Sequence, residues 1–446
     1  MRVVLFVHCF FPDHFYGTET YTLQLAKNLI YLGHEVTVVC GIFQGEQSND
    51  QVITAYTYDG VKVIAFDKNH VPHSRIAETY FQEETRPYLR QILEETKPDV
   101  VHVTHLVNHT AVLLEEVVRG NIPLVATLTD FYGFCFNNKL ESASGSLCAG
   151  PNLLRSNCIA CYLKAANHPI ARKVANVPMG WAASGLALSV ANGLKFDPVG
   201  DGGQAIHDIV VRPDVLKRAY THYDAMIAPS RFLLEAYGAN GFDRKKLHLS
   251  RFGVDIIRRP KPIKDPQSPI SIGYIGQIAP HKGVDLLVSA VRDFTTSQAR
   301  LDIYGPANQD VAYMQKLRSI AGSNVQFRGT FPPSEMAEIM SSFDLLAIPS
   351  TWYENSPLVL LNALASHTPV IVSDVQGLTE FIEEGISGWS FKRSDANSLK
   401  RLLAKLLQNR GLVRANSLRT TYDRTSLMMT QEVVSVYEQV KANRWR

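Results

Sequence analysis

Short, continuous apolar runs recur along the first half of the chain, separated by stretches in which apolar residues follow the helical period. Such runs are typical of parallel strands that are buried on both faces. They predict strands at residues 3–7, 35–39, 61–66, 100–103, 124–128 and 225–228. After the first run, apolar residues recur every three or four positions, and Gly33 stands where a helix would end. This alternation of strand and helix predicts a doubly wound, largely parallel sheet.

The same alternation begins again after a proline-rich stretch at residues 258–269, whose composition is typical of a linker. Apolar runs then predict strands at residues 271–275, 301–304, 325–327, 345–348 and 370–372. A turn at residues 276–283 separates the first of these strands from a helix. Near the carboxyl terminus a helical stripe is formed by Met429, Val433, Val436 and Val440. The sequence therefore predicts an α/β protein with two doubly wound domains and a terminal helix.

The overall composition is that of a globular protein of two or three domains. The chain has 446 residues, of which 46% are hydrophobic and 20% are charged. The net charge of +3 gives no reason to expect a nucleic acid partner. No apolar stretch approaches the length of a membrane span, and the apolar start, MRVVLFVHCFF, is brief and lacks a signal-peptide cleavage site. A cytoplasmic protein is therefore expected.

Residues 132–222 follow neither repeat, and we interpret them as an elaboration of the first domain near a ligand cleft or a membrane surface. Four of the six cysteines lie there: Cys135, Cys148, Cys158 and Cys161. Because no export signal is expected, thiols or metal ligands are favoured over disulfides. Four thiolates would bind a tetrahedral zinc ion that staples this long segment, and the alternative is four buried or free thiols. Cys9 and Cys40 are expected in core strands.

The run WYENSPLVLLN at residues 352–362 carries the strongest chemical signal. It follows the predicted strand at residues 345–348, and Pro357 suits the first turn of a helix because its missing N–H costs least there. This spacing places an exposed carboxylate, Glu354, just before a helix N-terminus at the carboxyl end of a strand. Open α/β sheets bind ligands at that edge, and free helix N–H groups favour phosphate. The alternative interpretation is a solvated acid in a loop.

A second loop, GQIAPHKG at residues 276–283, joins a predicted strand to a predicted helix. Its glycines let the backbone approach a ligand closely, and Lys282 can place a positive charge on a diphosphate. The spacing and the Gly-Lys-Ser/Thr ending of a Walker loop are absent. The alternative is a surface loop with an ordinary lysine.

In the first half, polar side chains follow two strands that end at the same edge of the predicted sheet. His105 comes after the strand at residues 100–103, and Asp130 comes after the strand at residues 124–128. A histidine in this place either orients a hydroxyl group or is a satisfied structural residue, and both interpretations stay open.

These motifs resemble those of the retaining nucleotide-sugar glycosyltransferases of the large fourth family, which have the GT-B fold. The run from Glu354 to Asn362 resembles the Glu-x7-Glu signature of that family, with Asn362 in place of the second Glu. The loop at residues 276–283 resembles its Gly-Arg-…-Lys-Gly element, with Gln277 where Arg is usual. Gly17-Thr18-Glu19 resembles its flexible Gly-Gly loop.

The resemblance implies two Rossmann-like domains that face each other across a cleft, and it covers residues 1–130 and 224–440. The implied parts are an acceptor domain at residues 1–257, a nucleotide-sugar donor domain at residues 258–423, and a helix at residues 424–446 that crosses back to the first domain.

The resemblance also implies roles for individual residues. Lys282 would grip the donor diphosphate, Glu354 would hydrogen-bond the hydroxyls of the donor sugar, and Asn362 would replace the glutamate that holds the ribose. The implied catalytic residues are Glu354, Lys282, His105 and Asp130. The implied donor-binding residues are Gly17, Gly276, Gln277, Lys282, Glu354, Asn355, Ser356, Leu358, Val359 and Asn362.

The implied reaction moves a hexose from a UDP- or GDP-sugar to an acceptor hydroxyl with retention of configuration, in polysaccharide or lipid-linked glycan biosynthesis. No metal is required for catalysis in this scheme. The chain has no Asp-x-Asp motif, which is the metal–diphosphate clamp of the other large glycosyltransferase fold. Apolar and basic residues at 132–222 indicate peripheral contact with the inner face of a membrane, where a lipid-linked acceptor would lie; simple packing on the first domain is the alternative.

Departures from the family pattern leave a second function open, a catalytically weak or inactive homologue that acts as a binding or scaffold subunit. They are Gln277, Asn362 and Thr129, the last at a position where relatives often have a histidine. A sugar-diphosphate epimerase or a phosphorylase on the same fold is a further alternative.

Overall fold

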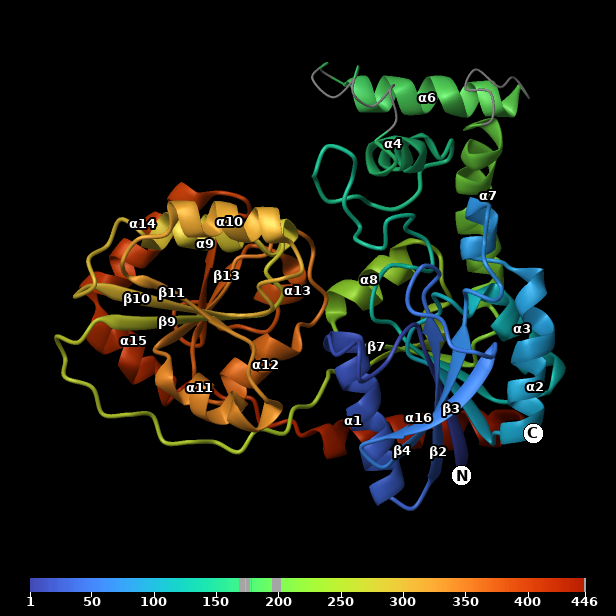
Figure 1. Ribbon diagram of the computed structural model, residues 1–446, viewed down its shortest axis with the longest axis horizontal. Helices are drawn as coiled ribbons and strands as arrows, with labels where there is room; N and C mark the ends of the chain where they lie inside the picture. Colours follow the sequence, from blue (N-terminus) through green and yellow to red (C-terminus); the bar gives the residue numbers. More distant parts are fainter. Residues whose placement is uncertain (168–172, 174–176, 178, 195–201, 445–446) are drawn as a thin grey trace. The chain divides into compact units, whose positions relative to one another are not determined.

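Two sheets of largely parallel strands organise the protein, as the apolar runs predict (Figure 1). The structure is a computed structural model and describes residues 1–167, 173, 177, 179–194 and 202–444. It divides into two units, Met1–Arg251 with Ser426–Arg446, and Phe252–Thr425. Each unit holds one sheet with its helices, so the predicted α/β fold with two doubly wound sheets is confirmed.

The first sheet has the strand order β3-β4-β2-β1-β5-β6-β7-β8. Its strands are β1 (Arg2–Val7), β2 (Glu35–Ile42), β3 (Ile53–Tyr58), β4 (Val61–Asp67), β5 (Val100–Val103), β6 (Leu124–Thr127), β7 (Ala225–Ala228) and β8 (Leu247–Leu249). All neighbouring strands pair in parallel except β3 and β4, which form an antiparallel hairpin. Every residue of β5, β6 and β7 is buried, which explains why unbroken apolar runs encode these strands.

Helices α1 and α16 lie together in the first unit although they come from opposite ends of the chain. The helices of this unit are α1 (Gly17–Tyr31), α2 (Arg86–Thr96), α3 (Thr110–Arg119), α4 (Ser156–Ala165), α6 (Gly180–Gly193), α7 (Gly202–Tyr220), α8 (Arg231–Ala239) and α16 (Ser426–Arg444), with short 3-10 turns at Ile76–Thr79, Glu83–Thr85 and Arg244–Lys246. Asn28 Nδ2 of α1 donates to Ser426 Oγ at 2.7 Å, and Tyr437 OH lies 2.6 Å from His102 Nδ1 of β5. The stripe of α16 buries Tyr437 rather than the predicted Val436.

The second sheet is parallel throughout and has the strand order β11-β10-β9-β12-β13-β14. Its strands are β9 (Ile270–Ile275), β10 (Ala299–Tyr304), β11 (Val325–Gly329), β12 (Leu345–Ile348), β13 (Val370–Ser373) and β14 (Gly388–Phe391). The helices are α9 (Val284–Val291), α10 (Val311–Ile320), α11 (Met336–Ser342), α12 (Leu358–Ala365), α13 (Gln376–Thr379), α14 (Ala396–Gln408) and α15 (Arg410–Ser417), with 3-10 turns at Pro280–Lys282 and Pro333–Glu335. The core of this unit packs α9 and α14 against the sheet.

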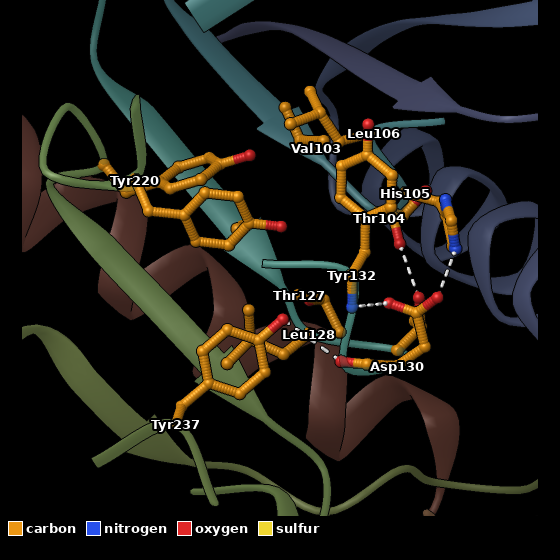
Figure 2. A pocket seen from close by; sticks show the side chains of 13 residues that line it. Val103, Thr104, His105, Leu106, Thr127, Leu128, Asp130, Tyr132, Tyr220 and Tyr237 are labelled. Atoms are coloured by element: carbon orange, nitrogen blue, oxygen red, sulfur yellow. Dashed lines mark hydrogen bonds and ion pairs between the residues drawn. The ribbon is translucent and has the colours of Figure 1, made fainter. Parts of the chain in front are cut away.

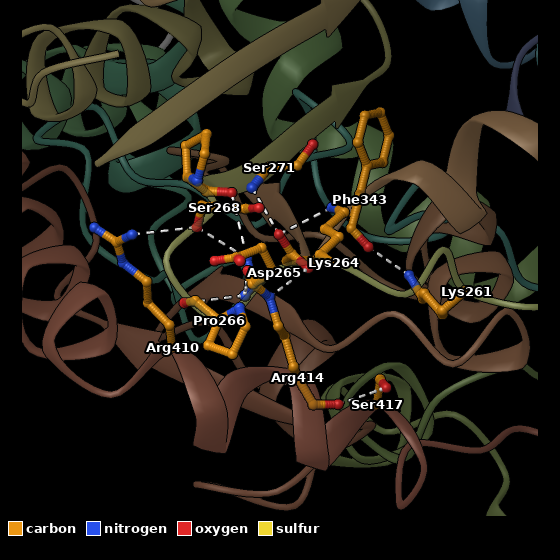
Figure 3. Close-up of polar contacts among 12 residues, drawn as sticks. Lys261, Lys264, Asp265, Pro266, Ser268, Ser271, Phe343, Arg410, Arg414 and Ser417 are labelled. Atoms are coloured by element: carbon orange, nitrogen blue, oxygen red, sulfur yellow. Dashed lines mark hydrogen bonds and ion pairs between the residues drawn. The ribbon is translucent and has the colours of Figure 1, made fainter. Parts of the chain in front are cut away.

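The predicted linker is fastened to the second unit by basic side chains (Figure 3). Lys261 is buried at its ammonium end and donates to Thr368 Oγ1 at 2.6 Å and to the carbonyl of Met340 at 3.1 Å. From α15, Arg410 and Arg414 donate to backbone carbonyls of residues 265–269. The proline-rich segment is therefore an irregular connection that makes defined contacts with the second unit, and not a flexible linker without contacts.

The elaboration of the first unit is helical and has its own small core. Its buried residues come from α4, α6 and α7: Cys158, Ile159, Leu163, Leu188, Ile206 and Ile209. Arg212 of α7 donates to the carbonyls of Tyr132 and Cys135, at 3.1 and 2.9 Å, and so fixes the start of the segment to the helix that ends it. Residues 168–172 and 195–201 of the segment lie outside the described residues, as do residues 174–176 and 178. Within the described part of the chain, no helix combines the length and apolar character needed to cross a membrane.

Candidate active site

The loop before α9 and the turn after β12 meet at one edge of the second sheet. Strands β9 and β12 are parallel neighbours, so their carboxyl ends lie side by side. Gly283, with φ of 66°, closes the loop: a Cβ atom there would lie 2.0 Å from the carbonyl oxygen of Pro349. Only glycine allows this backbone approach, and the approach brings the preceding residue, Lys282, to the turn that carries Glu354.

Lys282 and Glu354 form a close ion pair. Lys282 Nζ lies 2.7 Å from Glu354 Oε1, and Ser350 Oγ donates to the same oxygen at 2.6 Å. The ammonium group also lies 4.6 Å from the centre of the Trp352 ring. The sequence places these two residues correctly at neighbouring strand ends, but the expectation of an exposed carboxylate is wrong, because Glu354 is only 9% exposed.

The surroundings of Glu354 keep it ionised. Burial alone would raise the pKa of this carboxyl, but the positive charge of Lys282 and the hydrogen bonds from Lys282 and Ser350 bring the pKa below its ordinary value. A buried carboxylate with a fixed orientation is suited to accepting hydrogen bonds from ligand hydroxyls.

A third loop closes over the backbone of Glu354. A Cβ atom on Gly377, in the short helix α13, would lie 1.7 Å from the carbonyl oxygen of Glu354. Arg393, after β14, donates through Nη1 to the carbonyl of Thr351 and lies with Cζ 4.6 Å from the centre of the Tyr353 ring. These contacts bury the turn and explain why Glu354 is not at the surface.

Helix α12 begins directly after this turn, at Leu358. Pro357 stands one position earlier than the predicted first-turn position and has φ of −69°, and no side chain caps the helix. The first N–H groups of such a helix have no partner within the helix. Ser356 Oγ is buried and has no hydrogen-bond partner among the described residues.

Other donor residues predicted for the second unit lie along α12 and at the end of β9. Asn362 is one turn along α12 on the same, less buried face as Leu358 and Val359. Gly276 and Gln277 are half-buried at the end of β9, where the carbonyl of Gln277 accepts a hydrogen bond from Tyr274 OH at 2.6 Å. The described second unit therefore brings together the predicted donor residues that the sequence places at these strand ends.

In the first unit, His105 and Asp130 meet in a pocket at the carboxyl ends of β5 and β6 (Figure 2). His105 Nε2 lies 3.0 Å from Asp130 Oδ2, and the backbone N–H of Val107 donates to His105 Nδ1 at 3.2 Å. Because Nδ1 accepts, Nε2 carries the proton and donates to the carboxylate. The aromatic rings of Tyr132, Tyr220 and Tyr237 line the same pocket. Thr129 also lines it, and its hydroxyl donates a hydrogen bond to the carbonyl of Thr104.

His8 and Glu19 extend this group, although neither residue is assigned a role at the site from the sequence. The His8 and His105 rings lie 4.2 Å apart, and His8 Nε2 lies 3.0 Å from Glu19 Oε1. Burial and the nearby His105 lower the pKa of His8, although Glu19 opposes the shift. The signal for His8 was available: it directly follows β1, the strand beside β5, so it must lie at the same sheet edge as His105.

The predicted Gly-Gly-like loop and one predicted core cysteine are placed differently from expectation. Gly17 is the first residue of α1, so Gly17-Thr18-Glu19 is a helical turn and not a loop. Cys9 is buried, but it lies in the bend after β1 instead of in the strand. Its thiol lies 3.3 Å from Glu19 Oε1. In the described residues, His8, Cys9 and Glu19 are the one set of three His, Cys, Asp or Glu side chains whose ligand atoms all lie within 4.8 Å of one another.

The four cysteines of the elaboration, all within the described part of the chain, are free thiols, and no three of their sulfur atoms all lie within 4.8 Å of one another. Burial, and then Cys135 and Cys148, raise the pKa of Cys161 to about 12. Two N–H groups point at one of these sulfurs, since Gly150 N and Asn157 Nδ2 each lie 3.4 Å from Cys148 Sγ. The Cys135 thiol instead donates to Asn137 Oδ1 at 2.9 Å.

Two family models match the chain. The model of glycosyl transferases group 1 matches residues 255–422, and the model of glycosyltransferase family 4 matches residues 15–142.

Curated relatives match in part of their length. D-inositol 3-phosphate glycosyltransferase from Nocardia farcinica is 27% identical over 252 residues, which cover 51% of this chain and 55% of the relative. A putative colanic acid biosynthesis glycosyltransferase from Escherichia coli (strain K12) is 27% identical over 183 residues, which cover 38% of this chain and 44% of the relative. The chain thus spans about half the length of the curated relatives that it matches.

Solved structures match over almost the whole chain. Sucrose-phosphate synthase from Thermosynechococcus elongatus has a TM-score of 0.62 at 16% identity and is matched over 99% of both chains. The Anabaena protein HepE in complex with UDP-glucose has a TM-score of 0.62 at 13% identity, over 98% of this chain and 99% of that chain. The fold is that of the GT-B glycosyltransferases, and together with the two family models it supports a glycosyltransferase of the family 4 type.

Proposed function

We propose that this protein transfers a hexose from a nucleoside diphosphate sugar to an acceptor hydroxyl, with retention of the anomeric configuration. The observation that carries the proposal is the Lys282–Glu354 pair at 2.7 Å beside the uncapped start of α12. This geometry offers a cation and free N–H groups for a diphosphate next to a buried acceptor for sugar hydroxyls. The titles of structural neighbours name UDP and UDP-glucose, which agrees with such a donor.

Each residue of the candidate donor site in the second unit then has a defined role. Lys282 and the first N–H groups of α12, at Leu358 and Val359, hold the diphosphate and stabilise the charge that develops on it. Ser356 Oγ adds a donor to the phosphate or the sugar, Glu354 accepts from the sugar hydroxyls, and Asn362 hydrogen-bonds the ribose. In a front-face displacement the leaving phosphate takes the proton of the acceptor hydroxyl, so the protein acts by positioning and charge. Lys282 and the helix N-terminus supply the positive potential without a divalent cation.

The direct test is slow hydrolysis of UDP- and GDP-hexoses by the purified protein, with and without EDTA. We expect one donor to be hydrolysed at a rate that EDTA does not change and to release its sugar in the anomeric form of the donor. Loss of hydrolysis in EDTA would contradict metal independence. Failure to bind or hydrolyse any donor would favour the inactive scaffold subunit instead.

We further propose that His105 and Asp130 bind a hydroxyl group of the acceptor, a growing polysaccharide or a lipid-linked glycan. Relatives are named for colanic acid and amylovoran biosynthesis, which agrees with such acceptors. Burial alone would raise the pKa of Asp130, but the charge and hydrogen bond of His105 lower it, so Asp130 offers an ionised acceptor for a sugar hydroxyl.

His105→Gln is expected to lower the rate of transfer by about tenfold while changing donor hydrolysis little, because it removes one oriented hydrogen bond at the proposed acceptor site. The ratio of transferred to hydrolysed sugar measures this effect. His248→Gln, in the edge strand β8, serves as the matched control and should leave the ratio unchanged. Equal loss of both reactions in His105→Gln would contradict an acceptor role.

We also propose that Cys135, Cys148, Cys158 and Cys161 bind a structural zinc ion. The two N–H groups directed at Cys148 are the kind of outer contact that stabilises a metal-bound thiolate. The segment has only a small core of its own, so a metal would supply much of its folding free energy.

Purified protein is therefore expected to contain about one zinc ion per chain by elemental analysis. Cys158→Ser should release the metal and make residues 135–165 more sensitive to protease. Cys40→Ser, at a buried thiol of β2, is the control that should keep the metal. A metal-free preparation with an unchanged melting temperature would leave four free thiols as the correct interpretation.

A further inference from the structure

Helix α6 has an apolar face on each side. Its inner face packs on α4 so closely that a Cβ atom on Gly185 would lie 2.1 Å from the carbonyl oxygen of Ser156. Leu188 on the same face is buried in the small core of the elaboration, and Ser189 Oγ donates to the carbonyl of Leu154. The inner face therefore accounts for the attachment of α6 to α4 and α7.

The outer face of α6 is exposed, yet it carries no polar side chain. Its exposed residues recur at helical spacing: Ala182, Ala183, Leu186, Ala187 and Val190. Leu186 is 45% and Val190 is 48% exposed, and the helix as a whole, GWAASGLALSVANG, contains no charged residue. A surface helix of a globular protein normally turns charged and polar residues to water. An apolar face of this kind marks a surface that is covered by something else.

The face continues beyond both ends of the helix. Met179 and Val177 on one side and Leu194 on the other are also exposed apolar residues. Leu153 and Leu154, before α4, add further exposed apolar area to the same elaboration. In Figure 1, α6 lies across α4 at the outer end of the first unit, away from that unit's sheet. The apolar residues therefore belong to an outlying part of the unit and not to its main core.

The charge of the surrounding segment identifies the class of partner. Over the whole elaboration, residues 132–222, the chain has nine basic and five acidic residues. The whole chain has nearly balanced charges, with 45 basic and 42 acidic residues, so the excess is local. Apolar side chains that enter the acyl boundary, flanked by Lys and Arg that meet anionic headgroups, are the signature of a helix lying in a membrane interface.

We propose that the outer face of α6 docks into the surface of a membrane that contains anionic lipid. The helix would lie in the plane of the interface, with Leu186 and Val190 entering the acyl boundary, and the local excess of positive charge would attract anionic headgroups. This inference concerns residues other than the donor site and does not require sugar transfer. If transfer is also demonstrated, the docking would hold the enzyme at the surface where lipid-linked acceptors lie.

The test is co-sedimentation of the full chain with vesicles of phosphatidylcholine alone or mixed with phosphatidylglycerol. Wild-type protein should sediment with the anionic vesicles at low salt, and less at high salt, where headgroup attraction is screened. The affinity of the double variant Leu186→Glu/Val190→Glu for the anionic vesicles should be lower by about tenfold or more, because the variant places charge where apolar side chains enter the lipid.

The matched control is Leu412→Glu/Leu418→Glu, which changes two leucines in the second unit that are 52% and 82% exposed. This control should bind vesicles like the wild type. Both double variants should keep the wild-type melting temperature and donor hydrolysis in the absence of vesicles, which keeps the two proposals distinguishable. Absence of wild-type binding at low salt, or equal binding by the Leu186→Glu/Val190→Glu variant, would overturn the proposal. If the wild type does not bind vesicles but self-associates, and the Leu186→Glu/Val190→Glu variant loses that self-association, the face is instead assigned to a second copy of the chain.

Discussion

Lys282→Ala is expected to lower donor turnover by about 10²-fold or more, which is typical for the loss of one preorganised electrostatic donor. The ammonium group lies 2.7 Å from Glu354 and close to the uncapped start of α12, so its charge sits where a diphosphate would be held. Removing it also leaves Glu354 buried without its positive partner, which adds an unfavourable charge at the sugar position. Initial rates with saturating donor, together with nucleotide affinity by calorimetry, measure both consequences.

A comparison of Lys282→Ala with Glu354→Gln separates the two roles. Glu354→Gln should weaken use of the sugar while it largely spares the affinity for the free nucleotide diphosphate, because the amide keeps the shape but loses the charge. Lys400→Ala is the matched control: Lys400 is also a lysine of the second unit with a carboxylate partner, Asp293 at 2.6 Å. That partner follows the carboxyl end of α9, at the other end of this helix from Lys282. Wild-type turnover in Lys282→Ala, or an equal loss in Lys400→Ala, would show that the ion pair does not act on the donor.

Several of the strands that the sequence predicts are buried on both faces, although β10 and β11 are also predicted and carry exposed residues. Each residue of β5, β6, β7, β12 and β13 is buried, so the burial leaves an unbroken apolar run. The edge strand β3 alternates between exposed and half-buried residues and leaves no such run. Its turn does carry a signal, because Asp59 and Gly60 have φ of 45° and 79°, which is the conformation that an Asp-Gly hairpin turn requires. The short strands β8 and β14 are likewise absent from the prediction.

The place of the candidate donor site in the fold could be predicted from the sequence, but the burial of its residues could not. The order of strand, loop and helix fixes which residues reach the sheet edge, and this is enough to name Lys282 and Glu354. The burial of Glu354 depends on contacts between loops far apart in sequence, such as Gly283 against Pro349, and no local pattern reports them. His8 shows the opposite case, since topology alone would have placed it beside His105 if the strand order had been used for every residue that follows a strand.

Gly377→Ala is expected to disrupt the same site from a residue that contacts no ligand in the proposed mechanism. The φ of Gly377 is not in the left-handed region, so alanine is acceptable to the backbone itself. The obstacle is space: the added Cβ would lie 1.7 Å from the carbonyl oxygen of Glu354, and the neighbouring atoms are backbone, which cannot rotate away. The turn must therefore shift, and Glu354 must move relative to Lys282.

We expect this change to cost about 1–3 kcal/mol of stability, as overpacking does, and to lower turnover by about 10²-fold, because a catalytic group displaced by about 1 Å loses its alignment. Gly411→Ala is the control, since Gly411 lies inside α15 with open space around its Cβ position, where alanine should raise stability by about 0.5–1 kcal/mol. Thermal unfolding and donor hydrolysis of the two variants measure these effects. The decisive comparison is at a temperature where both proteins are folded: if Gly377→Ala then turns over donor like the wild type, the close approach of α13 to the turn serves stability and does not position Glu354.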